Sequence, residues 1–172
     1  MEDPFFANKA SCCFTGHRPK GLPAENSGGM ASLKLLLIRT VREAAAAGVG
    51  VFLCGGAEGF DTFAAEAVLA VREEFPALRL VLALPGRDFI AGRAPRERMR
   101  AEAILRAADE IVYAGETGHF ALAMRTRNRY LVDHADCCVS YLRHSRGGTL
   151  YTANYALSRG IPVRNLAKEL PL

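Results

Sequence analysis

The stretch Val49–Phe75 constrains the fold more than any other part of the sequence. An apolar run of strand length, Val49–Cys54, leads through a glycine-rich turn into apolar residues at helical spacing. The turn contains Gly55, Gly56 and Gly59. Glycine suits such a turn because it adopts positive φ and lets a second group approach the backbone closely. We expect Asp61 or Thr62 to cap the helix, whose first N–H groups would form a phosphate-type anion site. A glycine turn without a ligand is the alternative.

Apolar runs of strand length alternate with helical patterns along the whole chain. The expected strands are Ala10–Thr15, Val49–Cys54, Leu78–Leu84, Glu110–Tyr113, Cys137–Tyr141 and Ile161–Arg164. The expected helices are Met30–Ala47, one ending near Phe75, Arg96–Ala108, Ala121–His134, and one from the turn at Gly147 to Arg159. This alternation predicts an α/β fold with a mostly parallel sheet of about six strands, covered on both faces. Pro162 places the last strand at an edge.

Length and composition indicate one globular domain spanning residues 1–172. Hydrophobic residues make up 50% of the chain and charged residues 23%, and no composition break marks a second domain. No apolar run reaches the roughly 18 residues that cross a membrane, and the acidic N-terminus lacks the order of a secretory signal. We therefore expect a cytoplasmic protein without a membrane partner.

Charge and cysteine content exclude little by themselves. The net charge of +4, from 22 Lys and Arg against 18 Asp and Glu, is too small to diagnose nucleic-acid binding. The five cysteines form no C-x-x-C pair and lie in strand-like runs, so we expect buried thiols rather than disulfides or zinc ligands. No metal site is predicted. The apolar face of Met30–Ala47 leaves room for a homo-oligomer.

Three glycine turns should meet at the carboxyl edge of the sheet, where open α/β folds bind ligands. If the first strand is central, its turn lies beside those of the second and fifth strands. The first turn carries Thr15, Gly16, His17 and Arg18, whose groups suit phosphate and ribose contacts. Alternatively, Arg18 pairs with an acid on a neighbouring loop and His17 binds a backbone carbonyl.

The third turn, Gly147-Gly148-Thr149, repeats the arrangement of the second, with a helix N-terminus and a hydroxyl. It is shorter than G-x-G-x-x-G or the P-loop motif, so P-loop ATP hydrolysis is not expected. The loops after the third and fourth strands, Arg87–Pro95 and Ala114–Phe120, would form walls of the site with Phe89 and Phe120.

Four motifs in order resemble the YpsA-like family of the SLOG superfamily, which includes DprA and LOG-type proteins. They are Thr15–Pro19, Gly55–Asp61, Arg127–Asp136 and Gly147–Thr149, and the resemblance spans about residues 11–166. It implies a Rossmann-like three-layer sandwich whose glycine turns bind a nucleotide-derived ligand. The family positions it maps are Gly16, Arg18, Gly55, Gly56, Asp61, Asn128, Asp133, Gly147, Gly148 and Thr149. For Arg127 and Asn128, internal hydrogen bonds are the alternative to ligand contact.

Three functions follow as hypotheses. The first is binding of a nucleotide, ADP-ribose or NAD-type ligand, as a sensor or carrier. The second is hydrolysis of nucleoside 5′-monophosphates, with Asp61 and Arg18 as candidate catalytic residues. The LOG-type enzymes that it resembles use a glutamate after the last glycine turn, whereas Gly147–Ala153 has no carboxylate. Asp61 or Glu58 would therefore have to replace that glutamate. The third is single-stranded nucleic-acid binding, suggested by the relation to DprA and by five arginines: Arg125, Arg127, Arg129, Arg143 and Arg146.

Overall fold

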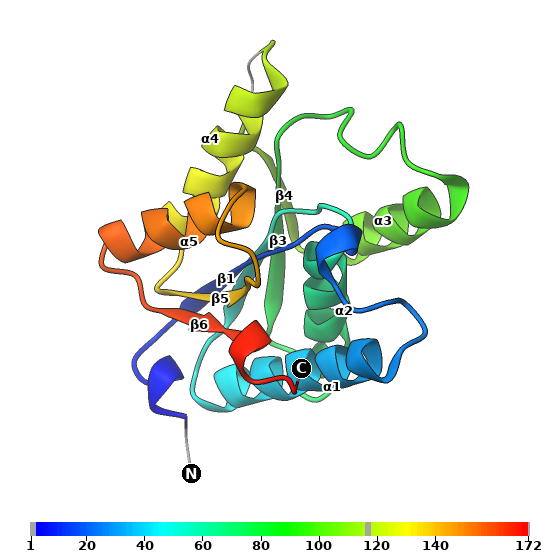
Figure 1. Cartoon of the computed structure of the whole chain (residues 1–172). Coiled ribbons are helices and arrows are strands. Elements are labelled where there is room, and N and C mark those ends of the chain that lie inside the picture. Colours follow the sequence, from blue (N-terminus) through cyan, green and yellow to red (C-terminus); the bar gives the residue numbers. More distant parts are fainter. Residues whose placement is uncertain (1–2, 116–117, 172) are drawn as a thin grey trace.

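A six-stranded parallel sheet lies between two layers of helices in the computed structural model, which describes residues 3–115 and 118–171 (Figure 1). The strand order is β4-β3-β2-β1-β5-β6, and every neighbouring pair is parallel. The strands are β1 (Ser11–Gly16), β2 (Val51–Cys54), β3 (Arg79–Leu84), β4 (Glu110–Tyr113), β5 (Cys137–Tyr141) and β6 (Val163–Asn165). The α/β, Rossmann-like class predicted from sequence is confirmed, including the edge position of the last strand.

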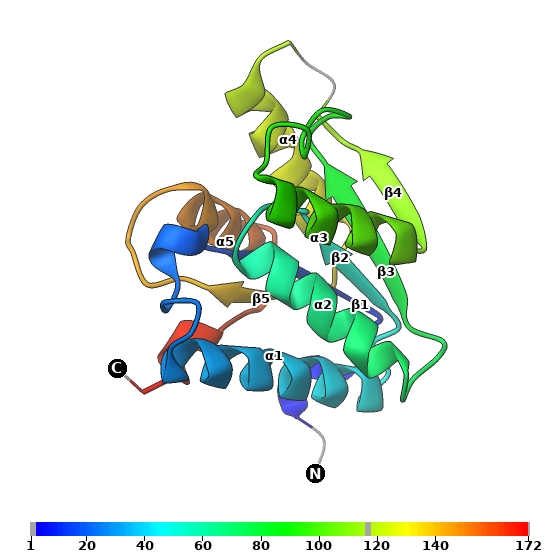
Figure 2. The same ribbon diagram turned by 90° about the vertical axis from the view of Figure 1, so that its right-hand side faces the viewer.

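Five α-helices form the two covering layers, with α1, α2 and α3 on one face and α4 and α5 on the other (Figures 1 and 2). Their bounds are α1 (Gly28–Ala46), α2 (Phe60–Arg72), α3 (Pro95–Ala107), α4 (Phe120–Asp133) and α5 (Gly148–Ser158). Three short 3-10 helices, η1 (Pro4–Phe6), η2 (Pro19–Gly21) and η3 (Leu166–Lys168), are also present. This is the geometry of right-handed strand–helix–strand units wound in both directions from β1.

Successive side chains of β1 enter opposite cores because strand residues alternate between faces. Cys12 and Phe14 belong to the larger core under α1 and α2, whereas Cys13 belongs to the smaller core under α4 and α5. All five cysteines are free and buried, as predicted. Burial raises the pKa of the Cys54 thiol well above its ordinary value, so this group behaves as a small hydrophobe.

Helix α1 begins earlier than expected and uses its apolar face internally. The Ser27 hydroxyl accepts a hydrogen bond from Met30 N at 3.1 Å, so the helix begins at Gly28 rather than at Met30. The apolar face predicted for it is buried in the larger core, and Leu35 on the opposite side of the helix is exposed. The homo-oligomer therefore stays a prediction without support from this helix.

The other element ends agree with expectation or differ by one or two residues, which is ordinary for termini, except that α2 ends at Arg72, three residues before the expected Phe75. Part of the expected loop Ala114–Phe120, namely residues 116 and 117, lies outside the described residues. Among the residues that are described, none of the helices combines the length and hydropathy that a membrane crossing demands.

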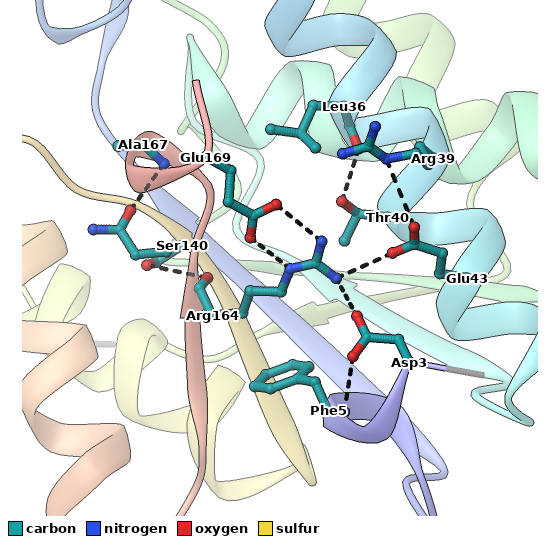
Figure 3. Close-up of polar contacts among 11 residues, drawn as sticks. Asp3, Phe5, Leu36, Arg39, Thr40, Glu43, Ser140, Arg164, Ala167 and Glu169 are labelled. Carbon is teal, nitrogen blue, oxygen red and sulfur yellow. Dashed lines mark hydrogen bonds and ion pairs between the residues drawn. The ribbon is translucent and has the colours of Figure 1, made fainter. Parts of the chain in front are cut away.

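Arg164 on β6 joins the two ends of the chain to helix α1 (Figure 3). Its guanidinium donates to Asp3 at 2.6 Å, to Glu43 at 3.1 Å and to both carboxylate oxygens of Glu169. It also lies 5.9 Å from the centre of the Phe6 ring. Hydrogen bonds to Glu169 raise the pKa of Arg164, so the guanidinium stays charged at any pH at which the protein folds.

Candidate functional site

The strand order reverses beside β1, at the carboxyl edge of the sheet. From β1 the chain proceeds through β2 and β3 to β4 on one side, and β5 and β6 lie on the other side. Ligand crevices of open α/β sheets form at such a switch point. The condition set from the sequence is met: β1 lies between β2 and β5, so its turn lies between theirs.

A cavity of about 410 Å³ occupies this position and is called here the first cavity. It brings together predicted residues from the first and third turns and from helices α2 and α4: Thr15, Gly16, His17, Arg18, Asp61, Asn128, Gly147, Gly148 and Thr149. Two predicted residues, Gly55 and Gly56, do not line it. Its apolar wall consists of Phe14, Ala57, Met124 and Leu131.

The charges around the first cavity favour an anion. Four cationic side chains line it, and Asp61 is the one carboxylate among the described lining residues. The cations are Arg18, Lys20, Arg127 and Arg146. Polar side chains are seldom fully buried. Around the first cavity, however, four polar side chains are at least nine-tenths buried: Thr15, Asp61, Arg127 and Thr149. Such a concentration of polar groups is typical of a binding site.

The N-terminus of α5 opens onto the first cavity. Its N-cap is Gly147, with φ at 93° and no side chain to cap the helix. A Cβ placed on Gly147 or Gly148 would meet no atom within 4 Å, so open space adjoins this backbone. The first N–H groups of a helix have no partner within the helix and carry the positive end of its dipole. An anion in the cavity would satisfy them.

The N-terminus of α2, in contrast, is filled by the protein itself. Phe60 N donates to His17 O at 3.1 Å, and a Cβ on Gly59 would come within 2.8 Å of the same oxygen. The expected capping by Asp61 or Thr62 is wrong, because α2 begins at Phe60 and both residues already belong to its first turn. Their side chains bind the backbone of Ala57 instead, at 3.2 and 2.9 Å.

The glycines of the second turn are required by packing. Gly56 has φ at 72°, and a Cβ there would lie 2.5 Å from Leu84 Cδ2. A Cβ on Gly55 would collide with the Arg127 guanidinium and the Asp61 carboxylate. Gly55 and Gly56 therefore do not line the first cavity: Gly55 makes room for Arg127 and Asp61, which do line it, and Gly56 makes room for Leu84. Their contact with a ligand stays a prediction.

Arg127 of α4 combines an internal role with exposure to the cavity. It is 97% buried, and it donates to the carbonyl oxygens of Gly55 and Ala83 and to Asn128 Oδ1. Burial lowers its pKa, and the nearby Asp61 opposes this shift. Burial raises the pKa of Asp61, while the positive charge of Arg127 acts against it. The two groups form a buried pair of opposite charges at the base of the cavity.

His17 ties the first turn to the loop that precedes α5. Its Nε2 accepts hydrogen bonds from Arg143 N at 2.8 Å and His144 N at 3.3 Å. Both bonds go to backbone N–H groups, whereas the alternative named a carbonyl, so Nε2 is unprotonated and the proton of the neutral ring lies on Nδ1. Burial, and then the nearby His144, lowers the pKa of His17, which favours the neutral form.

Arg18 stands at the mouth of the cavity and is exposed. The structure gives it no hydrogen bond or ion pair with another described side chain, so the predicted alternative of a pairing with a neighbouring acid is not seen. Its guanidinium therefore faces the cavity unpaired among the described residues, ready for a bidentate contact with an anion.

Sequence reasoning missed Lys20, Gly21, Met124 and His144 as lining residues. Lys20 and Gly21 lie in η2, directly after the Thr15–Pro19 motif, so their proximity in sequence to that motif could have indicated them.

Two acids of the Arg127–Asp136 segment lie away from the first cavity: Asp133 accepts from Tyr155 OH, and Asp136 accepts from the backbone of Ala10 and Ser11. Within the described ranges, no three His, Cys, Asp or Glu side chains gather as a metal would require.

A second cavity of about 490 Å³ adjoins the first and also contains Arg18. Phe89 and Phe120 line this second cavity and not the first one, so the two loops wall a neighbouring space. Glu58 also lies here, 3.8 Å from Arg93. This position removes Glu58 from the first cavity and leaves Asp61 as its carboxylate.

A parallel sheet with a cavity lined by basic side chains at its switch point defines a Rossmann-like α/β protein. The family model YpsA, described as the YspA SLOG family, matches residues 12–159, and the chain belongs to this family. The resemblance seen in the four motifs is thereby confirmed.

Two known proteins are similar to this chain. The uncharacterized SPbeta prophage-derived protein YoqJ of Bacillus subtilis (strain 168) is 29% identical over 116 residues, which cover 61% of this chain and 68% of YoqJ. The structure of DNA processing protein A from Helicobacter pylori, described for its single-stranded DNA binding mode, has a TM-score of 0.60 at 20% identity. It covers 94% of this chain and 67% of that protein, and this likeness concerns the fold.

Proposed function

We propose that the chain binds a phosphate-bearing, nucleotide-type ligand in the first cavity, as a sensor or carrier. The observation that carries the proposal is the uncapped N-terminus of α5, which opens onto a cavity lined by four cations and one carboxylate. Helix N-termini with glycine at the turn are recurrent phosphate sites. Thr15 and Thr149 add hydroxyl groups, and the apolar wall gives a surface for a base or sugar.

Gly148 offers the cleanest test of this proposal. A side chain fits there without collision, whereas a substitution at Gly56 would disturb packing against Leu84. In Gly148→Asp, the new carboxylate should repel a phosphate yet suit the helix dipole, so the chain stays folded. We expect isothermal titration calorimetry with a panel of nucleoside phosphates to show at least a tenfold loss of affinity, about 1.4 kcal/mol.

Gly148→Asn is the matched control, because it adds nearly the same volume without the charge. We expect it to lose much less affinity than Gly148→Asp. The proposal is wrong if no nucleoside phosphate binds the unmodified chain below millimolar concentration, or if the two variants bind equally well.

Hydrolysis of a nucleoside 5′-monophosphate is a second candidate, supported by Asp61. Its carboxylate lines the first cavity, and burial raises its pKa, a shift typical of acids that exchange protons with a substrate. Arg18 would hold the phosphate. We expect release of free base from the cognate monophosphate, lost in Asp61→Asn while binding persists. Absence of base release from every common monophosphate at high protein concentration removes this candidate.

Single-stranded nucleic-acid binding is a third candidate, supported by the exposed surface of α4 and α5. Arg125 and Arg129 lie over the Tyr151 ring at 5.7 and 6.0 Å, and Tyr151 is stacked with Tyr155. Arginine and aromatic rings together are typical of surfaces that bind single strands. Labelled oligonucleotides should then bind with an affinity that falls steeply with salt and falls further in Arg125→Ala. Binding that is undetectable or independent of salt contradicts it.

A further inference from the structure

The second cavity lies between the β3–α3 loop, residues 85–94, and the start of α4. Its volume of about 490 Å³ exceeds that of the first cavity. The proposed phosphate site makes no use of it. Side chains of several kinds line it, including Arg18, Glu58, Asp88, Phe89, Arg93 and Phe120.

Among the described residues, Arg18 alone lines both cavities. Its side chain is exposed and makes no hydrogen bond or ion pair with a described acid, so its guanidinium is available to a ligand that spans both cavities. Burial lowers the pKa of Arg93 and of Arg127, and the charge of Arg18 lowers both further. Three guanidinium groups thus lie near one another, and two carboxylates offset part of their repulsion: Glu58, 3.8 Å from Arg93, and Asp61. A phosphate group at the boundary would relieve this repulsion.

The far side of the second cavity has a different chemistry. The Phe89 ring is held by two guanidinium groups, Arg93 at 5.1 Å and Arg127 at 5.6 Å, so it presents a fixed apolar wall. Phe120 adds a second ring, of which 66% is exposed. The Glu58 and Asp88 carboxylates can accept hydrogen bonds but would repel a further phosphate. An uncharged ring that carries hydroxyl or N–H donors fits these groups.

We propose that the two cavities form one binding site and that the ligand consists of two ring systems joined by phosphates, with Arg18 at the linkage. The inference rests on the proposed function and narrows its ligand class to nucleoside-diphosphate conjugates of the ADP-ribose or nucleotide-sugar type. Each cavity alone is near the lower end of the range of about 300–1,000 Å³ typical of small-molecule sites, and the two together approach its upper end. A nucleoside monophosphate would leave the second cavity empty.

Gly86→Phe tests the second cavity without touching the first. Gly86 lines the second cavity, and a Cβ there would meet no atom within 4 Å, so the new ring can occupy the space without straining the fold. Gly92→Phe is the matched control, since Gly92 lies in the same loop, has equal room for a Cβ and lines neither cavity. The probes are two pairs, AMP with ADP-ribose and UMP with UDP-glucose, titrated by calorimetry.

We expect at least one conjugate to bind the unmodified chain ten times more tightly than its monophosphate. Gly86→Phe should remove this advantage while leaving the affinity for the monophosphate unchanged, and Gly92→Phe should change neither. The inference is overturned if the conjugate and the monophosphate bind equally, or if Gly86→Phe weakens both alike. Absence of binding by all four probes would overturn the proposed function as well, so the two failures are distinguishable.

Discussion

At the scale of residues, the buried hydroxyl of Tyr141 costs the fold stability because it lacks a hydrogen-bond partner among the described residues. The side chain is fully buried at the end of β5, stacked on Phe60, and no described residue hydrogen-bonds its hydroxyl. A buried hydroxyl without a partner costs about 1–3 kcal/mol. We expect Tyr141→Phe to leave the free energy of unfolding unchanged or to raise it by up to about 1 kcal/mol, measured by urea denaturation.

Tyr155→Phe provides the comparison, because the Tyr155 hydroxyl donates to Asp133 at 2.8 Å. It should not stabilise the chain. If Tyr141→Phe instead lowers the free energy of unfolding by more than about 1 kcal/mol, the hydroxyl has a partner such as a bound water.

At the scale of elements, the turn after β1 and the loop before α5 depend on each other through His17. The unprotonated Nε2 of His17 accepts from two successive backbone N–H groups of this loop, and protonation would abolish both bonds. The pKa of His17 is lower in the folded chain than in the unfolded chain, where it is about 6.5. Its stabilising contribution is therefore complete above that pH and is lost as the pH falls through the lower folded value.

We expect the unmodified chain to lose more stability between pH 7.5 and pH 5 than His17→Gln, whose amide oxygen can accept at any pH. The difference should not exceed about 1 kcal/mol, since His17 is partly exposed. Urea denaturation at the two pH values measures it. An identical pH dependence of the two chains would show that His17 does not titrate in this range.

The same pair of elements shows how far sequence reasoning reaches. Periodicity and glycine turns predicted the order of strands and helices along the chain and the three turns that meet at the cavity, because both signals are local. These signals could not predict that the N-terminus of α2 is occupied by the protein itself while the N-terminus of α5 opens onto the cavity. That difference depends on the bond from Phe60 N to His17 O, which joins residues far apart in the sequence.

On the scale of the whole molecule, Arg164 holds together segments from both ends of the chain. Removing its charge would leave Asp3, Glu43 and Glu169 facing one another without a shared cation. We expect Arg164→Met to lower the free energy of unfolding by about 1–3 kcal/mol at pH 7, less than the cost of breaking a fully buried pair.

Arg42→Met is the control, because it breaks the exposed pair with Glu74 and should change stability little. Equal losses of stability in the two variants would contradict this role of Arg164. The sequence around residue 164 did not predict this cluster, because Asp3 comes from the N-terminus and Glu43 from α1, both far from Arg164 in sequence.

The placement of the thiols has a practical consequence. All five cysteines belong to the three adjacent strands β1, β2 and β5, and none reaches solvent. An alkylating reagent can therefore modify the native chain only when its centre opens. The rate of alkylation therefore reports how often the core opens, and it can be compared between variants and between the free and ligand-bound protein without an added label.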